Sequence, residues 1–300
     1  MNSTERYLEL LKGCLTRTLD GYGETYLPVL PHRGSWKHWA FEPVRRYLDH
    51  RDMQVIRRVP FNPTARAEGR EWPAEAETMI GLARLDNLHQ LIADVIGNRV
   101  PGDLAECGVW RGGATIFMRA VLEAYGDPDR LVWVADSFEG LPRPDPDRFP
   151  AERGDTHWRH QELAVGVDQV RRNFARYGLL DDRVRFLKGW FADTLPGAPI
   201  TRLAVLRLDG DLYGSNIEVL EALYPKVSPG GYVVIDDYGN IPQCRQAIDD
   251  YREANGITDP LNRIDWAGVW WQVDGSAERP GSGEARVITI EDAAVEDARA

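Results

Sequence analysis

The sequence contains few of the features that define a secreted, membrane-bound or nucleic-acid-binding protein. Its three cysteines, Cys14, Cys107 and Cys244, are scattered, so they form no disulfide framework, and no pair has metal-ligand spacing. No apolar run is long enough to cross a bilayer, and the polar N-terminus lacks the apolar core of a signal peptide. Basic side chains number 36 against 47 acidic ones, and the resulting net charge of −11 argues against nucleic acid as a partner. We therefore expect a cytoplasmic protein that binds neither nucleic acid nor membrane.

Common catalytic signatures are missing as well. The sequence has no Gly-x-Ser-x-Gly turn, no Ser/His/Asp order and no lysine loop for phosphate. The six histidines lack metal-ligand neighbours, and we interpret them as surface or packing residues, although His157 and His160 lie in a loop from which they could reach a site. Candidate chemistry must therefore be sought in the residues that follow predicted strands.

The chain divides by pattern into a helical first part and an alternating second part. Residues 1–100 are predicted to form helices with irregular connections, including a loop from Arg57 to Pro73 and a long helix that begins near Pro73 and ends just before Gly97. In residues 101–275, short apolar runs alternate with helical patterns as far as a closing hairpin in "IDWAGVWWQV". This alternation predicts a mostly parallel, doubly wound α/β sheet. Residues 276–300 are expected to be a mobile tail, in which "RVITI" could add a strand.

Ligands of such sheets bind beyond the carboxyl ends of the strands. The first predicted strand is followed by Glu106, Gly108 and Arg111 in "AECGVWRGG", where glycines let a ligand approach the backbone. The second ends at Asp136, a carboxylate suited to accept hydrogen bonds from both hydroxyls of a ribose. The alternatives are a tight turn for the first group and a loop aspartate for the second.

The third predicted strand is followed by "GWFADTLP". Trp190 and Phe191 could flank a purine there, and Asp193 could meet its exocyclic amine. Core aromatic residues are the alternative interpretation. Taken together, the three strand ends favour a nucleoside-containing ligand.

Acidic side chains remain at the ends of the fourth and fifth strands. Ser215 and Glu218 predict a capping box for one following helix, and Asn240 predicts the cap of the other, so the acids are not needed as caps. Carboxylates without a thiol or a nearby histidine form a site for a hard cation, most simply Mg²⁺. The alternative is a solvated acidic rim. The acids are Asp209, Asp236 and Asp237.

Several long motifs in one order resemble the macrocin O-methyltransferase family, which methylates sugar hydroxyls of natural products such as macrolides and aminocoumarins. They are "AECGVWRGGAT", "DSFEGLP", "FLKGWFADTLP", "LRLDGDLYGS" and "VVIDDYG", and the likeness extends from about Tyr7 to about Tyr251. The resemblance implies a class I methyltransferase fold, which is Rossmann-like, with an N-terminal helical lid, and it implies a homo-oligomer. S-adenosylmethionine and Mg²⁺ are the implied cofactors, and a glycosylated small molecule is the implied acceptor.

The resemblance also implies roles for particular residues. It places the cofactor against Glu106, Gly108, Asp136 and Ser137, and the metal against Asp209, Asp236 and Asp237, with Asp209 also the favoured base. Two other functions stay open at this point. A phenol or catechol could be the acceptor, or the protein could bind a nucleotide without catalysis.

Overall fold

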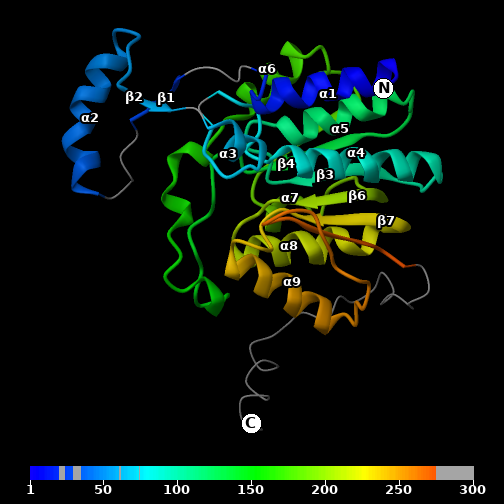
Figure 1. The fold of residues 1–300 in the computed structure, drawn as a ribbon. Helices are drawn as coiled ribbons and strands as arrows, with labels where there is room; N and C mark the ends of the chain where they lie inside the picture. The colour runs from blue at the N-terminus through cyan, green and yellow to red at the C-terminus, as the bar shows by residue number, and fades with distance from the viewer. Residues whose placement is uncertain (20–23, 30–34, 61, 74, 275–300) are drawn as a thin grey trace.

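The computed structural model describes residues 1–19, 24–29, 35–60, 62–73 and 75–274. The predicted tail, including "RVITI", lies outside these residues. A seven-stranded sheet has the order β5-β4-β3-β6-β7-β9-β8, in which β5 to β7 are mutually parallel and β9 runs antiparallel to both β7 and β8 (Figure 1). The predicted α/β sheet and its closing hairpin are therefore confirmed. The strands are β3 (Asp103–Cys107), β4 (Val132–Asp136), β5 (Val184–Lys188), β6 (Leu203–Leu208), β7 (Val227–Ile235), β8 (Asn262–Arg263) and β9 (Val269–Gln272).

Helices cover both faces of the sheet, in two separate apolar cores. One core contains buried side chains from α1, α4, α5 and α6, and the other contains side chains from α8 and α9 (Figure 1). Strands buried on both faces need a largely apolar sequence, and in β6 all six residues are buried and five are apolar, with Arg207 the exception. The helices are α1 (Ser3–Thr16), α4 (Leu82–Gly97), α5 (Gly113–Ala124), α6 (Val167–Arg176), α7 (Phe191–Thr194), α8 (Tyr213–Leu223) and α9 (Pro242–Ala254).

The first helix belongs to the core of the sheet domain. Asn2 and Glu5 form a capping box that starts α1. Its Leu8 and Leu15 are fully buried in the same cluster as Leu104 of β3. A boundary at residue 100 therefore cuts through one continuous core, and α1 and α4 are parts of that core.

The long helix predicted to begin near Pro73 begins at Leu82 instead. The residues before it form backbone hydrogen bonds with other elements: Glu77 donates from its N–H to the carbonyl of Leu15 (3.0 Å) and accepts at its own carbonyl from Gly113 (2.9 Å). These bonds pull the chain away from a helical path, because a helix would use the same groups internally. The segment thereby becomes part of the wall of a cavity.

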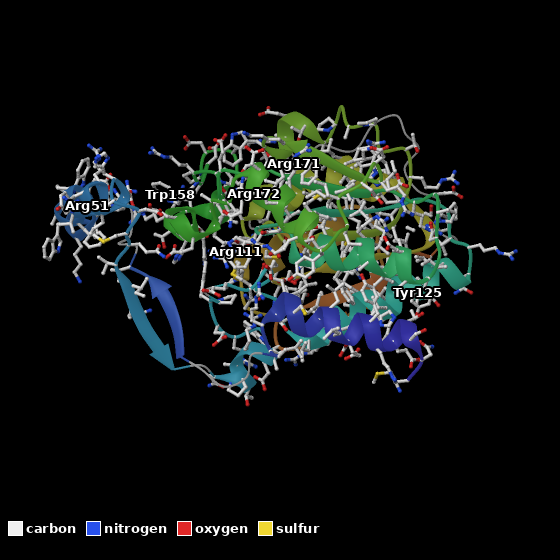
Figure 2. The ribbon with its side chains drawn as sticks, turned by 90° about the horizontal axis from the view of Figure 1, so that it is seen from above. Arg51, Arg111, Tyr125, Trp158, Arg171 and Arg172 are labelled. Carbon is white, nitrogen blue, oxygen red and sulfur yellow. The ribbon has the colours of Figure 1, made fainter. Side chains whose placement is uncertain are left out.

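The described residues between 24 and 60 stand away from the sheet domain (Figures 1 and 2). We call residues 24–60 the arm. Strands β1 (Glu24–Pro28) and β2 (Ile56–Pro60) pair antiparallel, and α2 (Trp36–Asp49) connects them. In Figure 2, Arg51 of the arm lies far from Arg111 of the sheet domain. The loop predicted for Arg57 to Pro73 thus contains most of β2 and, in addition, the short helix α3 (Pro63–Ala67).

None of the helices in the described part of the chain is both long and apolar enough to cross a lipid bilayer.

Two leucines of α1 test whether this helix belongs to the core. We expect Leu15→Ala to lower the free energy of unfolding by about 2–5 kcal/mol, because it removes buried methyl groups and leaves a cavity. Leu10 is 57% exposed on the same helix, so Leu10→Ala should change stability by less than about 0.5 kcal/mol. Urea unfolding of both variants measures the difference, and equal values would show that α1 does not pack as described.

Candidate active site

A cavity of about 790 Å³ opens at the carboxyl ends of the parallel strands. Its floor is formed by residues that follow β3, β4, β6 and β7, and its walls by residues 69–80 and 140–163. Ligands of open parallel sheets bind at this edge, and a cavity of this size accommodates a nucleoside together with a second small molecule.

The turn after β3 forms one side of this floor. Gly108 has a φ of +88°, and a Cβ atom on it would lie 1.9 Å from the carbonyl oxygen of Asp209. Only glycine fits there, because the backbones that follow β3 and β6 are in contact. The close approach at this glycine is between two backbone segments, and the approach of a ligand there stays a prediction.

Glu106 lies at the end of β3 and is 2% exposed. Its Oε1 accepts a hydrogen bond from Arg207, whereas its Oε2 has no partner among the described residues. Burial raises the pKa of Glu106 to about 8, assisted by the charges of Asp209 and Asp236 and opposed by Arg207. A buried carboxylate oxygen without a partner, in a residue that lines the cavity, is suited to meet a donor on a ligand.

Asp136 and Ser137 line the cavity at the end of β4. The two carboxylate oxygens of Asp136 accept from the N–H groups of Val109 (2.8 Å) and Phe138 (2.7 Å), and burial raises its pKa. The hydroxyl of Ser137 donates to the carbonyl of Gly140 (2.7 Å). Both side chains therefore hold the turns around them, and they are fixed in place at the cavity surface.

The residues after β5 divide between the cavity and solvent. Trp190 and Phe191 line the cavity, whereas Asp193 is exposed on α7 and does not. Arg111 does not line the cavity either: its guanidinium donates to the carbonyl of Ala76 (2.9 Å). The sequence therefore placed Phe191 at the cavity, but the structure does not bring Arg111 or Asp193 there.

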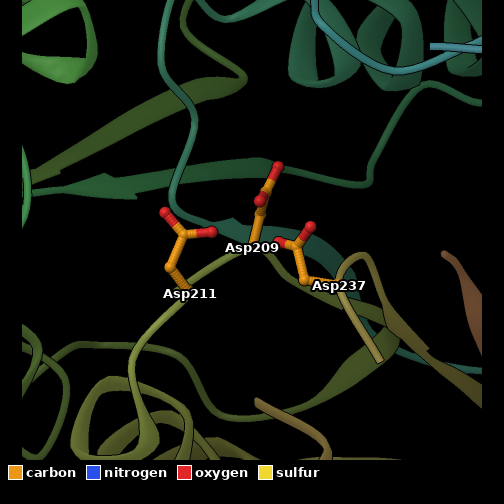
Figure 3. Close-up of side chains that lie close together, drawn as sticks. All are labelled: Asp209, Asp211 and Asp237. Atoms are coloured by element: carbon orange, nitrogen blue, oxygen red, sulfur yellow. The ribbon is translucent and has the colours of Figure 1, made fainter. Parts of the chain in front are cut away.

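Three carboxylates meet on the other side of the floor (Figure 3). One oxygen of each of Asp209, Asp211 and Asp237 lies within 4.8 Å of the others. Burial and mutual repulsion raise the pKa of Asp211 to about 7 and of Asp237 to about 8, and they raise that of Asp209 well above its usual range. Such a group is stabilised by a cation placed among the oxygens.

Asp236 was predicted in this group, but the structure places its carboxylate against two arginines. One oxygen accepts from Arg84 of α4 and the other from Arg207 of β6. Asp211 takes its place in the group of three. The sequence contains a signal for this residue, because Asp209 and Asp211 lie two residues apart directly after a strand. Because Asp236 and Asp237 are adjacent, they point in different directions.

The predicted helix caps beside these acids are wrong. Helix α8 begins at Tyr213, before Ser215, and α9 follows Ile241; neither has a side-chain cap. Asn240 donates instead to Asp237 (2.9 Å) and so helps to hold that carboxylate in the group. The acids are not helix caps, as predicted, but the reason is that neither helix has any side-chain cap.

The wall formed by residues 140–163 contributes two acidic residues that the sequence did not identify and two histidines that it had allowed as an alternative. Glu152 is buried and accepts from the N–H of Gly214 (2.7 Å), which anchors this wall to α8. Asp155 orients the ring of His157 (3.0 Å), and His160 stacks on Trp72 from the opposite wall with ring centroids 5.4 Å apart. Both histidines line the cavity. The sequence favoured surface or packing roles for them and allowed a position at a site only as an alternative.

Comparison with solved structures defines the class of protein to which the fold and cavity belong. The structure entitled "Structure of the O-methyltransferase NovP" aligns with a TM-score of 0.74 and 47% sequence identity, covering 91% of this chain and all of that one. The fold is thus that of a class I methyltransferase, as predicted.

Comparison of sequences then defines the family. The model of the macrocin O-methyltransferase (TylF) family matches residues 4–273. An 8-demethyl-8-(2,3-dimethoxy-alpha-L-rhamnosyl)-tetracenomycin-C 4'-O-methyltransferase of Streptomyces olivaceus is 58% identical over 212 residues, 70% of this chain and 81% of the relative. A demethyldecarbamoylnovobiocin O-methyltransferase of Streptomyces niveus is 55% identical over 224 residues, 74% of this chain and 86% of the relative. The chain belongs to the macrocin O-methyltransferase family, and it is an S-adenosylmethionine-dependent O-methyltransferase.

Proposed function

We propose that the protein transfers a methyl group from S-adenosylmethionine to a sugar hydroxyl of a glycosylated natural product, with Mg²⁺ as a second cofactor. The group of carboxylates on the cavity floor carries this proposal. The acceptor class is supported by the relative that methylates a rhamnosyl tetracenomycin. A sugar hydroxyl needs more help than a phenol, because it loses its proton much less readily, and a cation site beside the cofactor would supply that help.

The residues along β3 and β4 fit a nucleoside-containing cofactor. Glu106 offers a carboxylate oxygen without a protein partner, and Gly108 keeps the floor free of side-chain atoms. Asp136 and Ser137 present fixed oxygen atoms, and Phe191 adds an aromatic surface. We assign the cofactor to these five residues and leave out Arg111 and Asp193, since neither lines the cavity.

Two aspartates provide a matched test of the cofactor residues. Asp136→Asn should weaken the binding of S-adenosylhomocysteine about tenfold or more, because an amide oxygen and nitrogen cannot accept from both ribose hydroxyls, and a hydrogen bond to a charged group contributes about 1.5–3 kcal/mol. Asp193→Asn, on exposed α7, should leave the affinity unchanged. Isothermal titration calorimetry compares the two, with thermal melts to check folding. Equal affinities would refute the assignment of Asp136.

The chemistry of the donors fits Mg²⁺, which prefers carboxylate oxygens. Among the described residues, no basic side chain pairs with Asp211 or Asp237, so their charges have no protein counterion at hydrogen-bonding distance. We propose Asp209 and Asp237 as ligands. Asp211 or Asp236 completes the set: Asp211 lies nearer, whereas Asp236 would have to share oxygens that now accept from arginines.

When bound, S-adenosylmethionine supplies the methyl group, and Mg²⁺ favours the deprotonated form of the acceptor oxygen. The protein's own residues orient the acceptor and take its proton. If Asp236 completes the metal site, Asp211 is the carboxylate left to act as the base; if Asp211 completes it, Asp209 takes that role, as the sequence suggested. The walls around Trp72 and His157 line the cavity and would hold the two reactants at a fixed approach.

Acceptor and metal dependence test the proposed function directly. Methylation of a rhamnosylated polyketide with a free sugar hydroxyl, followed by mass spectrometry, should stop in EDTA and return with Mg²⁺. Asp209→Asn should lower kcat at least about 100-fold, because it weakens the metal site and removes a proton acceptor. Asp193→Asn is the control with unchanged rate. Full turnover by metal-free enzyme would exclude the metal role, and turnover of a catechol but not of the glycoside would exclude the acceptor class.

Two further variants identify the third metal ligand. Mg²⁺ titrations of Asp211→Asn and Asp236→Asn should show that one substitution greatly weakens Mg²⁺ binding. If that substitution is Asp236→Asn, then Asp211→Asn should retain the ion and lose turnover, as expected for the base. Retention of full Mg²⁺ affinity by both variants would contradict a three-carboxylate site.

We also propose that the protein forms a homo-oligomer through the arm. No residue of α2 is buried, and Trp36 and Trp39 are 76% and 74% exposed. A two-stranded ribbon and a single helix are only marginally stable in water without further packing. The arm contains seven basic and four acidic side chains, so the rest of the chain has a net charge of −14, which favours the surface of a second copy as the occupant.

The arm proposal predicts a concentration-dependent mass. The double variant Trp36→Ser/Trp39→Ser should dissociate the oligomer to monomers in size-exclusion chromatography with light scattering, because it removes the largest exposed apolar groups of α2. The control is Trp72→Ser, which alters an exposed tryptophan at the cavity instead. A wild-type protein that is monomeric at all concentrations would overturn the proposal.

A further inference from the structure

Arg207 is the residue through which the two halves of the site contact each other. It lies in the middle strand, β6, with 1% of its side chain exposed. One nitrogen, Nη1, donates both to Glu106 at the end of β3 and to Oδ2 of Asp209 (3.0 Å). The other, Nη2, donates to Asp236 at the end of β7.

Arg207 is shared by the proposed cofactor residues and the proposed metal ligands. Glu106 belongs to the proposed cofactor residues, and Asp209 to the proposed metal ligands. Nη1 has two N–H groups and donates one to each carboxylate, so both carboxylates depend on the position and charge of one guanidinium. A change in the charge of one carboxylate therefore changes how firmly Arg207 holds the other.

The charges around Arg207 make this shared dependence strong. Five carboxylates of the candidate site outnumber the two arginines that pair with members of the group, Arg84 and Arg207, and Arg84 is shared with a further carboxylate, Asp265. When these groups are ionised, the cluster carries an excess of negative charge. A divalent cation would reduce that excess. The five carboxylates are Glu106, Asp209, Asp211, Asp236 and Asp237.

We propose that Arg207 is a positioning residue that couples metal binding to cofactor binding. A cation on Asp209 reduces the attraction of that carboxylate for Nη1, so the nitrogen turns more fully to Glu106 and fixes it in the orientation that meets the cofactor. This inference rests on the proposed function. It adds that each ligand should tighten the binding of the other, with Arg207 as the connection.

Arginine is needed because of its geometry as well as its charge. Its planar fork reaches three carboxylates from three neighbouring strands at once, whereas a lysine ammonium acts as a single point charge. Arg207→Lys should therefore keep most of the charge balance and lose the coupling. Arg207→Met should lose both.

Calorimetry of the full-length protein with S-adenosylhomocysteine measures the coupling. This ligand lacks the sulfonium charge, so direct repulsion by Mg²⁺ does not mask the effect. In the wild type, saturating Mg²⁺ should tighten binding about fivefold or more, and S-adenosylhomocysteine should tighten Mg²⁺ binding by the same factor, since coupling free energies are reciprocal. In Arg207→Lys and Arg207→Met both factors should fall to about one.

Arg119 offers a matched control for the loss of a buried arginine. Its side chain is also 1% exposed and ion-paired, with Asp181 and Glu123, but it does not line the cavity. Arg119→Met should lower the melting temperature and leave the coupling factor at the wild-type value. A purely structural role for Arg207 would instead make the two arginine-to-methionine variants alike in coupling.

The outcomes separate this inference from the proposed function. Absence of any S-adenosylhomocysteine or Mg²⁺ binding by the wild type would refute the proposed function itself. Binding of both without coupling, or wild-type coupling in Arg207→Lys, would refute only the role of Arg207. If the Arg207 variants do not fold, Glu106→Gln replaces them. This substitution removes the charge that Arg207 holds on the cofactor side, so the coupling factor should again fall to about one. An unchanged coupling factor would refute the inference.

Discussion

The ion pairs of Arg207 are the constraint on which the rest of the site depends. Removing carboxylates from water is costly unless positive charge and hydrogen-bond donors accompany them. The sheet order places β6 between β3 and β7, and Glu106 lies opposite Arg207 in the register of the first pair of strands. One side chain from the middle strand can therefore serve acids from both neighbours. Without it, the end of the sheet could not keep this density of negative charge folded and ready for a cation.

Arg84 extends this network to the helical layer. It comes from α4, pairs with Asp236 and Asp265, and so connects the region before the sheet to the carboxyl ends of the strands. The region of residues 1–100, predicted as a helical lid, thus includes a helix whose Arg84 contacts a carboxylate of the site. A helix pattern in the sequence shows which face is apolar but not what that face packs against. Helices α1 and α2 differ in this respect, because α1 is buried against the sheet domain, whereas no residue of α2 is buried.

The sequence predicted the features that depend on local pattern. Strands, helices and their alternation are local, and so is the rule that ligand sites lie beyond the strand ends, which led to Glu106, Asp136 and Asp209, all of which line the cavity. The choice between Asp211 and Asp236 in the group of three is not local. It depends on Arg84, which lies 152 residues away in the sequence from Asp236. The helix caps failed for a related reason, since Asn240 is engaged with Asp237 and is not available to a helix terminus.

The walls of the cavity are built on a different physical basis from its floor. The floor rests on strands with fully buried residues, whereas the walls are irregular segments connected to one another by side-chain contacts. Trp72 stacks on His160, and Trp266 donates to the carbonyl of Glu68 (2.8 Å). These two contacts lie outside the two apolar cores, so substitutions at Trp72 or Trp266 should cost less stability than substitutions of buried residues in the floor. On the proposed function, the sheet fixes the residues of the chemistry, and wall residues of this kind can change without disturbing it.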